Sequence, residues 1–86
     1  MNINELEAIV KKKLKSQIKI DKIDIEDKSF LHKNHSGHQE GKFHLKITIE
    51  SEELINLGKI NGTKKIYKIL DQELKHHIHS IQILIS

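Results

Sequence analysis

Apolar residues near the start of the chain repeat with the spacing of an amphipathic helix. Between positions 4 and 17 they fall at Leu6, Ile9, Val10 and Leu14, close to a 3.6-residue period. Two glutamates stand at the start of this segment and four lysines follow, an order of charge that suits the helix macrodipole. The pattern predicts a helix over residues 4–17 with one buried face.

The next two apolar segments have the spacing of β-strands. In residues 18–27 the alternation of isoleucines loses phase between Ile20 and Ile23, which predicts a bulge or a late start of the strand. Residues 43–49 alternate cleanly, and His44 belongs to the polar set that faces the other way. We therefore expect a half-buried strand with one covered and one wet face.

The rest of the chain alternates between polar connections and further elements. Residues 29–41 are polar, contain two glycines and read as a loop. Ser51 is a suitable cap for a short helix or irregular segment that runs to about residue 62. Apolar spacing then predicts a helix over residues 63–75 and a strand over residues 78–85.

The resulting order is helix, strand, strand, short helix, helix, strand. It predicts an α+β fold in which a three-stranded mixed sheet carries its helices on one face. The length of 86 residues suits a single domain, which we expect to span residues 1–86.

Composition excludes several classes of site. The chain has no cysteine, which rules out a disulfide framework, a cysteine-rich zinc site and an iron–sulfur cluster held by thiolates of this chain alone. The formal charge of +3 is too small to indicate nucleic-acid binding. No apolar run approaches the ~20 residues that span a bilayer, and the first residues hold no signal core. We expect a cytoplasmic protein with no membrane partner.

Histidine is the unusual component, with seven in the chain. Neutral imidazole is a ligand for iron, zinc, copper and nickel. Six of the seven histidines form two groups, which are His32, His35 and His38 in the loop and His76, His77 and His79 at the junction of the last helix and strand. The plainer interpretation is a solvated loop in the first group, and in the second a pair, at positions 76 and 77, that complements the helix C-terminus.

The order of elements and a set of short motifs resemble the BolA-like family, whose fold is related to the type II KH domain. The resemblance covers roughly residues 20–85. Its motifs are Asp27-Lys28-Ser29 after the first strand, the Phe43-led second strand, Ser51 and Leu54 in a Ser-x-x-Phe turn, Lys64-Lys65-Ile66-Tyr67 in the long helix, and His79-Ser80-Ile81 opening the last strand.

The chain also departs from the family pattern. Gly62, Thr63 and Lys64 stand where the family often has Arg-His-Arg, and Asn56, which tolerates a left-handed backbone, replaces a frequent glycine. Gly58 and Gly62 are four apart, so the Gly-x-x-Gly clamp of KH domains is missing.

The resemblance implies a non-enzymatic adaptor that binds a monothiol glutaredoxin in iron–sulfur cluster assembly, transfer or sensing. It implies that His79 and His32 hold one side of a [2Fe–2S] cluster, with His38 and His35 as substitutes for the loop ligand. The glutaredoxin cysteine and a glutathione thiol would hold the other side. The cluster is therefore not expected in the isolated chain, which would be a monomer when free and a heterodimer with its partner.

Two other functions compete with this one. A transcriptional regulator would bind DNA through a basic face made of Lys59, Lys64, Lys65 and Lys68. Against it, the 15 basic residues are all lysine and aromatic residues total 3%, which leaves little for guanine readout or base stacking. A small enzyme would use paired carboxylates such as Glu52-Glu53 or Asp71 near Glu73, which we expect to be exposed. No catalytic-triad spacing or phosphate loop accompanies them, and we expect no enzyme.

Overall fold

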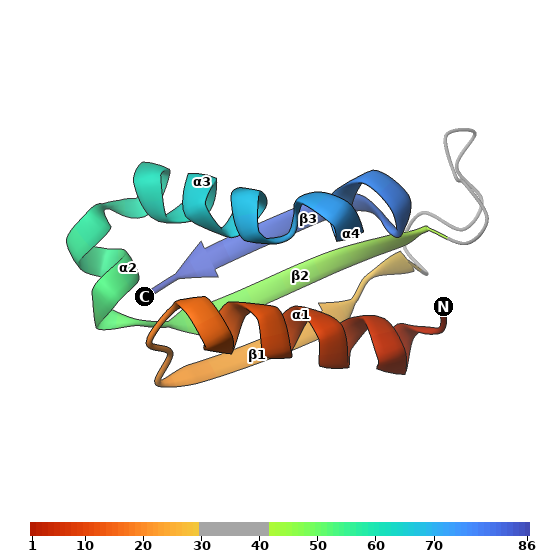
Figure 1. Ribbon diagram of the computed structural model, residues 1–86, viewed down its shortest axis with the longest axis horizontal. Coiled ribbons are helices and arrows are strands. Elements are labelled where there is room, and N and C mark those ends of the chain that lie inside the picture. The colour runs from red at the N-terminus through yellow and green to blue at the C-terminus, as the bar shows by residue number, and fades with distance from the viewer. Residues whose placement is uncertain (30–41) are drawn as a thin grey trace.

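The computed structural model describes residues 1–29 and 42–86, and within these residues the elements follow the predicted order except that the expected long helix is divided in two. They are α1 (Ile3–Gln17), β1 (Lys22–Asp27), β2 (Phe43–Glu50), α2 (Glu52–Leu57), α3 (Lys59–Ile69), α4 (Asp71–His76) and β3 (Ile78–Ile85). The strands form one sheet in the order β1-β2-β3, in which β2 is antiparallel to β1 and parallel to β3 (Figure 1). The expected α+β fold with a mixed sheet is confirmed.

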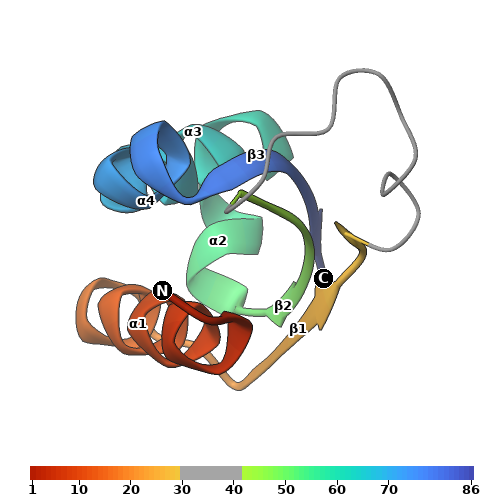
Figure 2. The same cartoon turned by 90° about the vertical axis from the view of Figure 1, so that its right-hand side faces the viewer.

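The described helices lie together on one face of the sheet (Figure 2). Since β2 and β3 are parallel, the chain must cross from the end of one to the start of the other. Helices α2, α3 and α4 make this crossing, and α1 packs beside them (Figures 1 and 2). The opposite face of the sheet is therefore available for polar side chains.

The first helix begins one residue before the predicted start. The side chain of Asn2 caps it by accepting a hydrogen bond from the backbone N–H of Glu5 at 2.8 Å. Its buried face consists of Leu6, Val10 and Leu14, and Ile9, the fourth member of the predicted stripe, is half-buried. Among the described residues, no helix combines the length and apolar character that crossing a membrane requires.

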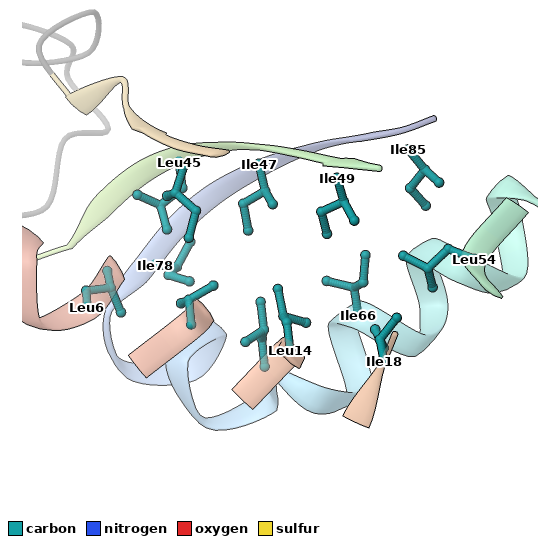
Figure 3. Close-up of a cluster of buried hydrophobic side chains, with 13 residues drawn as sticks. Leu6, Leu14, Ile18, Leu45, Ile47, Ile49, Leu54, Ile66, Ile78 and Ile85 are labelled. Carbon is teal, nitrogen blue, oxygen red and sulfur yellow. The ribbon is translucent and has the colours of Figure 1, made fainter. Parts of the chain in front are cut away.

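The core lies between the sheet and the helices. Inner-face side chains such as Ile47 and Ile49 point toward Leu14 of α1 and Ile66 of α3 (Figure 3). Full burial of one such side chain contributes about 1.5–3 kcal/mol. The buried members are Leu6, Val10, Leu14, Ile18, Ile25, Leu45, Ile47, Ile49, Leu54, Ile66, Leu70, Ile78 and Ile85.

The first strand starts late, which is one of the two outcomes that its broken alternation predicted. Ile18 is the C-cap of α1 and is buried in the core, so it packs with the helix rather than with the sheet. The strand begins only at Lys22. Ser51 is the predicted cap of α2, because its Oγ accepts from the N–H of Leu54 at 3.2 Å and donates to the carbonyl oxygen of Lys19 at 2.7 Å.

The helical region differs from the prediction in two places. Helix α3 starts at Lys59 rather than at position 63, directly after Gly58, whose φ of 90° is the only positive φ among the described residues. Asn56 therefore does not take the left-handed conformation. The expected single long helix is also divided at Leu70, where ψ turns to 19° before α4 begins.

Candidate functional site

Two histidines from neighbouring strands meet at the end of the sheet where β2 and β3 begin. The ring centroids of His44 on β2 and His79 on β3 are 4.8 Å apart, with the ring planes tilted by 46°. His79 is exposed, whereas His44 is only 5% exposed. The pair therefore presents one accessible imidazole that rests against a buried one.

A β-bulge sets the direction of His79. Phe43 pairs with Ile78 and His44 pairs with Ser80, so His79 is an extra residue on β3. Unbroken alternation would place His79 on the same face as Ile81, toward the helices. The bulge instead lets Ile78 enter the core and leaves His79 and Ser80 both exposed, in keeping with the ability of bulges to redirect side chains.

Hydrogen bonds hold His44 from both neighbouring strands. Its Nδ1 lies 2.6 Å from the Oγ of Ser80 on β3. Its backbone N–H donates to the Oγ of Ser29 at 3.1 Å, and its carbonyl oxygen accepts from the N–H of Lys28 at 2.7 Å. The backbone of His44 is thus bonded to the end of β1, and its imidazole is bonded to β3.

The Asp27-Lys28-Ser29 motif has a structural role at this site. The N–H of Ser29 donates to the Oδ1 of Asp27 at 2.9 Å, which closes a local turn of the Asx type. This turn presents the Ser29 hydroxyl to the backbone of His44 and continues the pairing of β1 with β2 beyond Asp27. On the other side, the N–H of Phe43 donates to the carbonyl oxygen of His77 at 2.9 Å.

Of the predicted cluster ligands, only His79 lies among the described residues. His79 is exposed near the start of β3, beside the pairing of Ile78 with Phe43 of β2. His32, His35 and His38 lie outside the described residues. His76 ends α4 and His77 is its C-cap, as predicted for residues that complement a helix C-terminus.

Sequence reasoning missed His44 as a site residue. It placed this histidine correctly on the polar face of the second strand but expected that face to be wet. Burial of His44 follows from the partners supplied by the flanking strands, namely Ser29 and Ser80. A parallel pairing of the strands would have suggested a contact between positions 44 and 79, but the register depends on the bulge.

The surroundings of the pair are polar. A hollow of about 270 Å³ on the outer face of the sheet is lined by Lys28, His44, Leu45, Lys46, Ser80, Ile81 and Gln82. Its two ammonium groups lie 3.6 and 3.9 Å from the carboxylate of Glu26, so their charge is partly balanced. Imidazole, hydroxyl and amide groups here can bind a metal centre or a polar partner, but they include no thiolate.

The histidine pair is not a complete metal site by itself. Within residues 1–29 and 42–86, no group of three histidine, aspartate or glutamate side chains is arranged to hold a metal ion. Neutral imidazoles without a thiolate suit one half of a shared coordination shell.

Three of the four carboxylates considered for catalysis are engaged in ion pairs, and Glu52, the fourth, is exposed as expected. Glu73 is 6% exposed, which corrects the expectation of an exposed side chain, and it lies 2.7 Å from Lys13. Burial is possible because the ammonium group neutralises the carboxylate. Asp71 pairs with Lys75 at 3.1 Å, and Glu53 pairs with Lys65 at 3.0 Å. These contacts are structural in character.

The basic face of α3 is smaller than the sequence suggested. Lys59, Lys64 and Lys68 are exposed. Lys65, the fourth candidate, is bound to Glu53. Three exposed lysines remain on this helix for contact with an anionic partner.

Comparison with known proteins agrees with this architecture. Residues 14–86 match the family model described as BolA-like protein. The chain is 28% identical over 78 residues to the DNA-binding transcriptional regulator BolA of Haemophilus influenzae, an alignment that covers 91% of this chain and 73% of the relative.

Solved structures with the same fold come from other organisms. BolA1 from Arabidopsis thaliana superposes with a TM-score of 0.75 at 22% identity, over 92% of this chain and 87% of that one. The BolA domain of SufE1 from the same plant gives 0.77 at 22% identity, over 100% and 93%. A bol-like protein from Babesia bovis gives 0.68 at 14% identity, over 91% and 79%.

Proposed function

The chain belongs to the BolA-like family, and we propose that it is an adaptor that forms a heterodimer with a monothiol glutaredoxin and shares a [2Fe–2S] cluster with it. The observation that carries this proposal is the exposed His79, which the β3 bulge turns away from the core and which rests against His44. An exposed imidazole of fixed direction is suited to binding a centre that a partner presents.

The donor groups of the chain fit half of the cluster's coordination shell. His79 and His32 would hold one iron, with His38 and His35 as the other candidates for the loop ligand. The partner's cysteine and a glutathione thiol would hold the second iron. When bound, the cluster supplies one-electron redox chemistry or is passed on as cargo.

Ligand type also sets the behaviour of such a centre. Two imidazoles in place of two thiolates leave less negative charge on the cluster and raise its reduction potential. Imidazole binds metal only when it is neutral, so protons compete with the metal for the ring nitrogen. We therefore propose that the shared cluster is released on mild acidification.

The occurrence of this fold as a domain of SufE1 in Arabidopsis is in keeping with a module that works joined to another protein. In the present chain the partner would be bound without a covalent link. The free chain would then be a monomer that carries no cluster.

Co-expression with a monothiol glutaredoxin tests the proposal. We expect a brown heterocomplex with a visible circular-dichroism spectrum of a [2Fe–2S] cluster and two irons per complex. His79→Ala should weaken the cluster or alter its spectrum, whereas His76→Ala, which changes an exposed histidine at the end of α4, should leave the spectrum unchanged. An identical spectrum after His79→Ala would refute the ligand assignment.

A second candidate function is regulation through DNA binding. It is favoured by the relative from Haemophilus influenzae, which is named a DNA-binding transcriptional regulator. In the present chain the exposed lysines of α3, Lys59, Lys64 and Lys68, would contact the phosphate backbone. Such binding would be strongly dependent on salt and weakly dependent on sequence.

A further inference from the structure

We propose that His44 is the positioning residue for His79, holding its exposed imidazole in one orientation through ring contact and through a hydrogen bond to the adjacent Ser80. This inference rests on the proposed function, because orientation matters only if the His79 imidazole binds a centre. It assigns a role to a histidine that no motif of the chain singled out.

The imidazole rings of His44 and His79 differ in burial. His79 is exposed on the bulge, so on its own its side chain would sample several rotamers. His44 is 5% exposed and its ring lies 4.8 Å from that of His79. A fixed ring against one face of a mobile ring removes some of its rotamers and leaves the other face accessible.

Hydrogen bonds hold both the ring and the backbone of His44. The imidazole can orient a neighbour only if it is itself held, and its Nδ1 lies 2.6 Å from the Oγ of Ser80. Its backbone is bonded in addition to Lys28 and Ser29 at the end of β1. The buried ring therefore has a defined position before any partner arrives.

The bulge lies where the two histidines meet. Pairing of β2 with β3 shifts between Phe43 and His44, so the regular ladder does not by itself fix the backbone at His79. The bond between His44 and Ser80 joins the two strands at this irregularity. The same imidazole thus restrains both the backbone next to His79 and the ring of His79.

Three variants separate these contributions. His44→Phe keeps a ring and removes Nδ1, and Ser80→Ala removes only the hydroxyl. His44→Ala removes both the ring and the hydrogen bond that its Nδ1 makes. Thr48→Ala, on the same strand and the same face but half-buried farther along, is the matched control. Because Ser80 is exposed, its variant remains informative if the alanine at position 44 impairs folding.

The first measurement uses the free protein. Three-bond couplings and nuclear Overhauser contacts of the His79 side chain should report one dominant χ1 rotamer in the wild type and in Thr48→Ala. They should report averaging over rotamers in His44→Ala. Partial averaging is expected in Ser80→Ala, and the ring of His44→Phe should restore most of the order.

The second measurement uses the glutaredoxin heterocomplex. We expect His44→Ala to weaken cluster retention by about tenfold, as is typical of a residue that orients a ligand, and to shift the visible circular-dichroism spectrum and the reduction potential. His44→Phe should recover most of the retention.

The outcomes are distinguishable. If His79→Ala changes the spectrum but His44→Ala and Ser80→Ala change neither the spectrum nor the His79 rotamer, the positioning role is refuted and the proposed function stands. If His44→Phe abolishes the cluster as completely as His79→Ala does, His44 is itself a ligand and the inference is overturned. If His79→Ala leaves the spectrum unchanged, the proposed function fails and the inference fails with it.

Discussion

Lys13 on α1 donates hydrogen bonds to both carboxylate oxygens of Glu73 on α4, at 2.9 and 2.7 Å. Glu73 is 6% exposed, and its partner is the half-buried ammonium group. The pair joins the first helix of the chain to the helix that leads directly into the strand of His79. It therefore holds α1 and α4 together within the helical layer.

Removal of Lys13 should destabilise the fold. In Lys13→Met the carboxylate of Glu73 stays buried without its ammonium partner, and we expect a loss of about 1.5–3 kcal/mol in the free energy of unfolding. Urea denaturation measures it. Lys12→Met, at an exposed neighbouring position, should change the free energy little. Similar losses in both variants would contradict a specific role for the pair.

Acidification should reveal the contribution of Glu53. Hydrogen bonding from Lys65, and next from the backbone N–H of Lys19, holds the pKa of the Glu53 carboxyl below its ordinary value of 4.5. A lowered pKa in the folded state stabilises the fold above the ordinary pKa, and this contribution disappears as the pH falls through the folded-state pKa.

The expected result is a pH-dependent difference between wild type and Glu53→Gln. Their free energies of unfolding should differ at pH 7 and converge as the pH falls below 4.5 and through the lowered pKa. Chemical denaturation at a series of pH values checks this. Glu52→Gln removes a charge from the same helical turn and leaves the Lys65 contact in place, so it should not reproduce the convergence. A constant difference for Glu53→Gln would rule out the linkage.

Substitution of Gly58 should cost stability through the backbone alone. Its φ of 90° and ψ of 149° suit glycine, and an added Cβ would meet no atom within 4 Å. We expect Gly58→Ala to lower the free energy of unfolding by about 1–3 kcal/mol. Asn56→Ala, an exposed change in the same turn region, should stay within about 0.5 kcal/mol. Equal effects would show that the conformation at position 58 is not required.

The DNA-binding candidate can be tested by salt dependence. If α3 contacts phosphates, log K falls as log salt rises, and the magnitude of this negative slope should decrease by about 0.9 for each lysine removed. Lys64→Gln with Lys68→Gln should therefore flatten the slope by nearly two. Lys12→Gln, on α1, should not alter it. Binding that is absent, or that loses as much from the α1 variant, would exclude α3 as a DNA contact.

The order of elements could be predicted because the spacing of apolar residues differs between helices and strands. The apolar stripe of Leu6, Val10 and Leu14 became the buried face of α1. Ser51, with its short polar side chain before two glutamates, became a helix cap. These features depend on neighbours within a few residues, which a local pattern records.

Other features depend on contacts between distant segments. No glycine or proline lies close to Leu70 in the sequence, yet the long helix divides there. The local sequence predicts that Glu73 is exposed, because its partner Lys13 lies on the distant helix α1. The candidate site is of this second kind, because the bulge in the register of β3 decides that His79 faces outward and meets His44.

The parallel pairing of β2 with β3 has a kinetic consequence. Neighbouring antiparallel strands can associate as soon as both are made, but the histidine-bearing strands can join only after the intervening helices have brought β3 back beside β2. A partly opened chain with β3 detached from the edge would keep the β1–β2 pair and lose the contact of His44 with His79. In the proposed heterocomplex the contact between His44 and His79 would be available only while β3 is paired with β2, and amide exchange along β3 would measure how often this pairing opens.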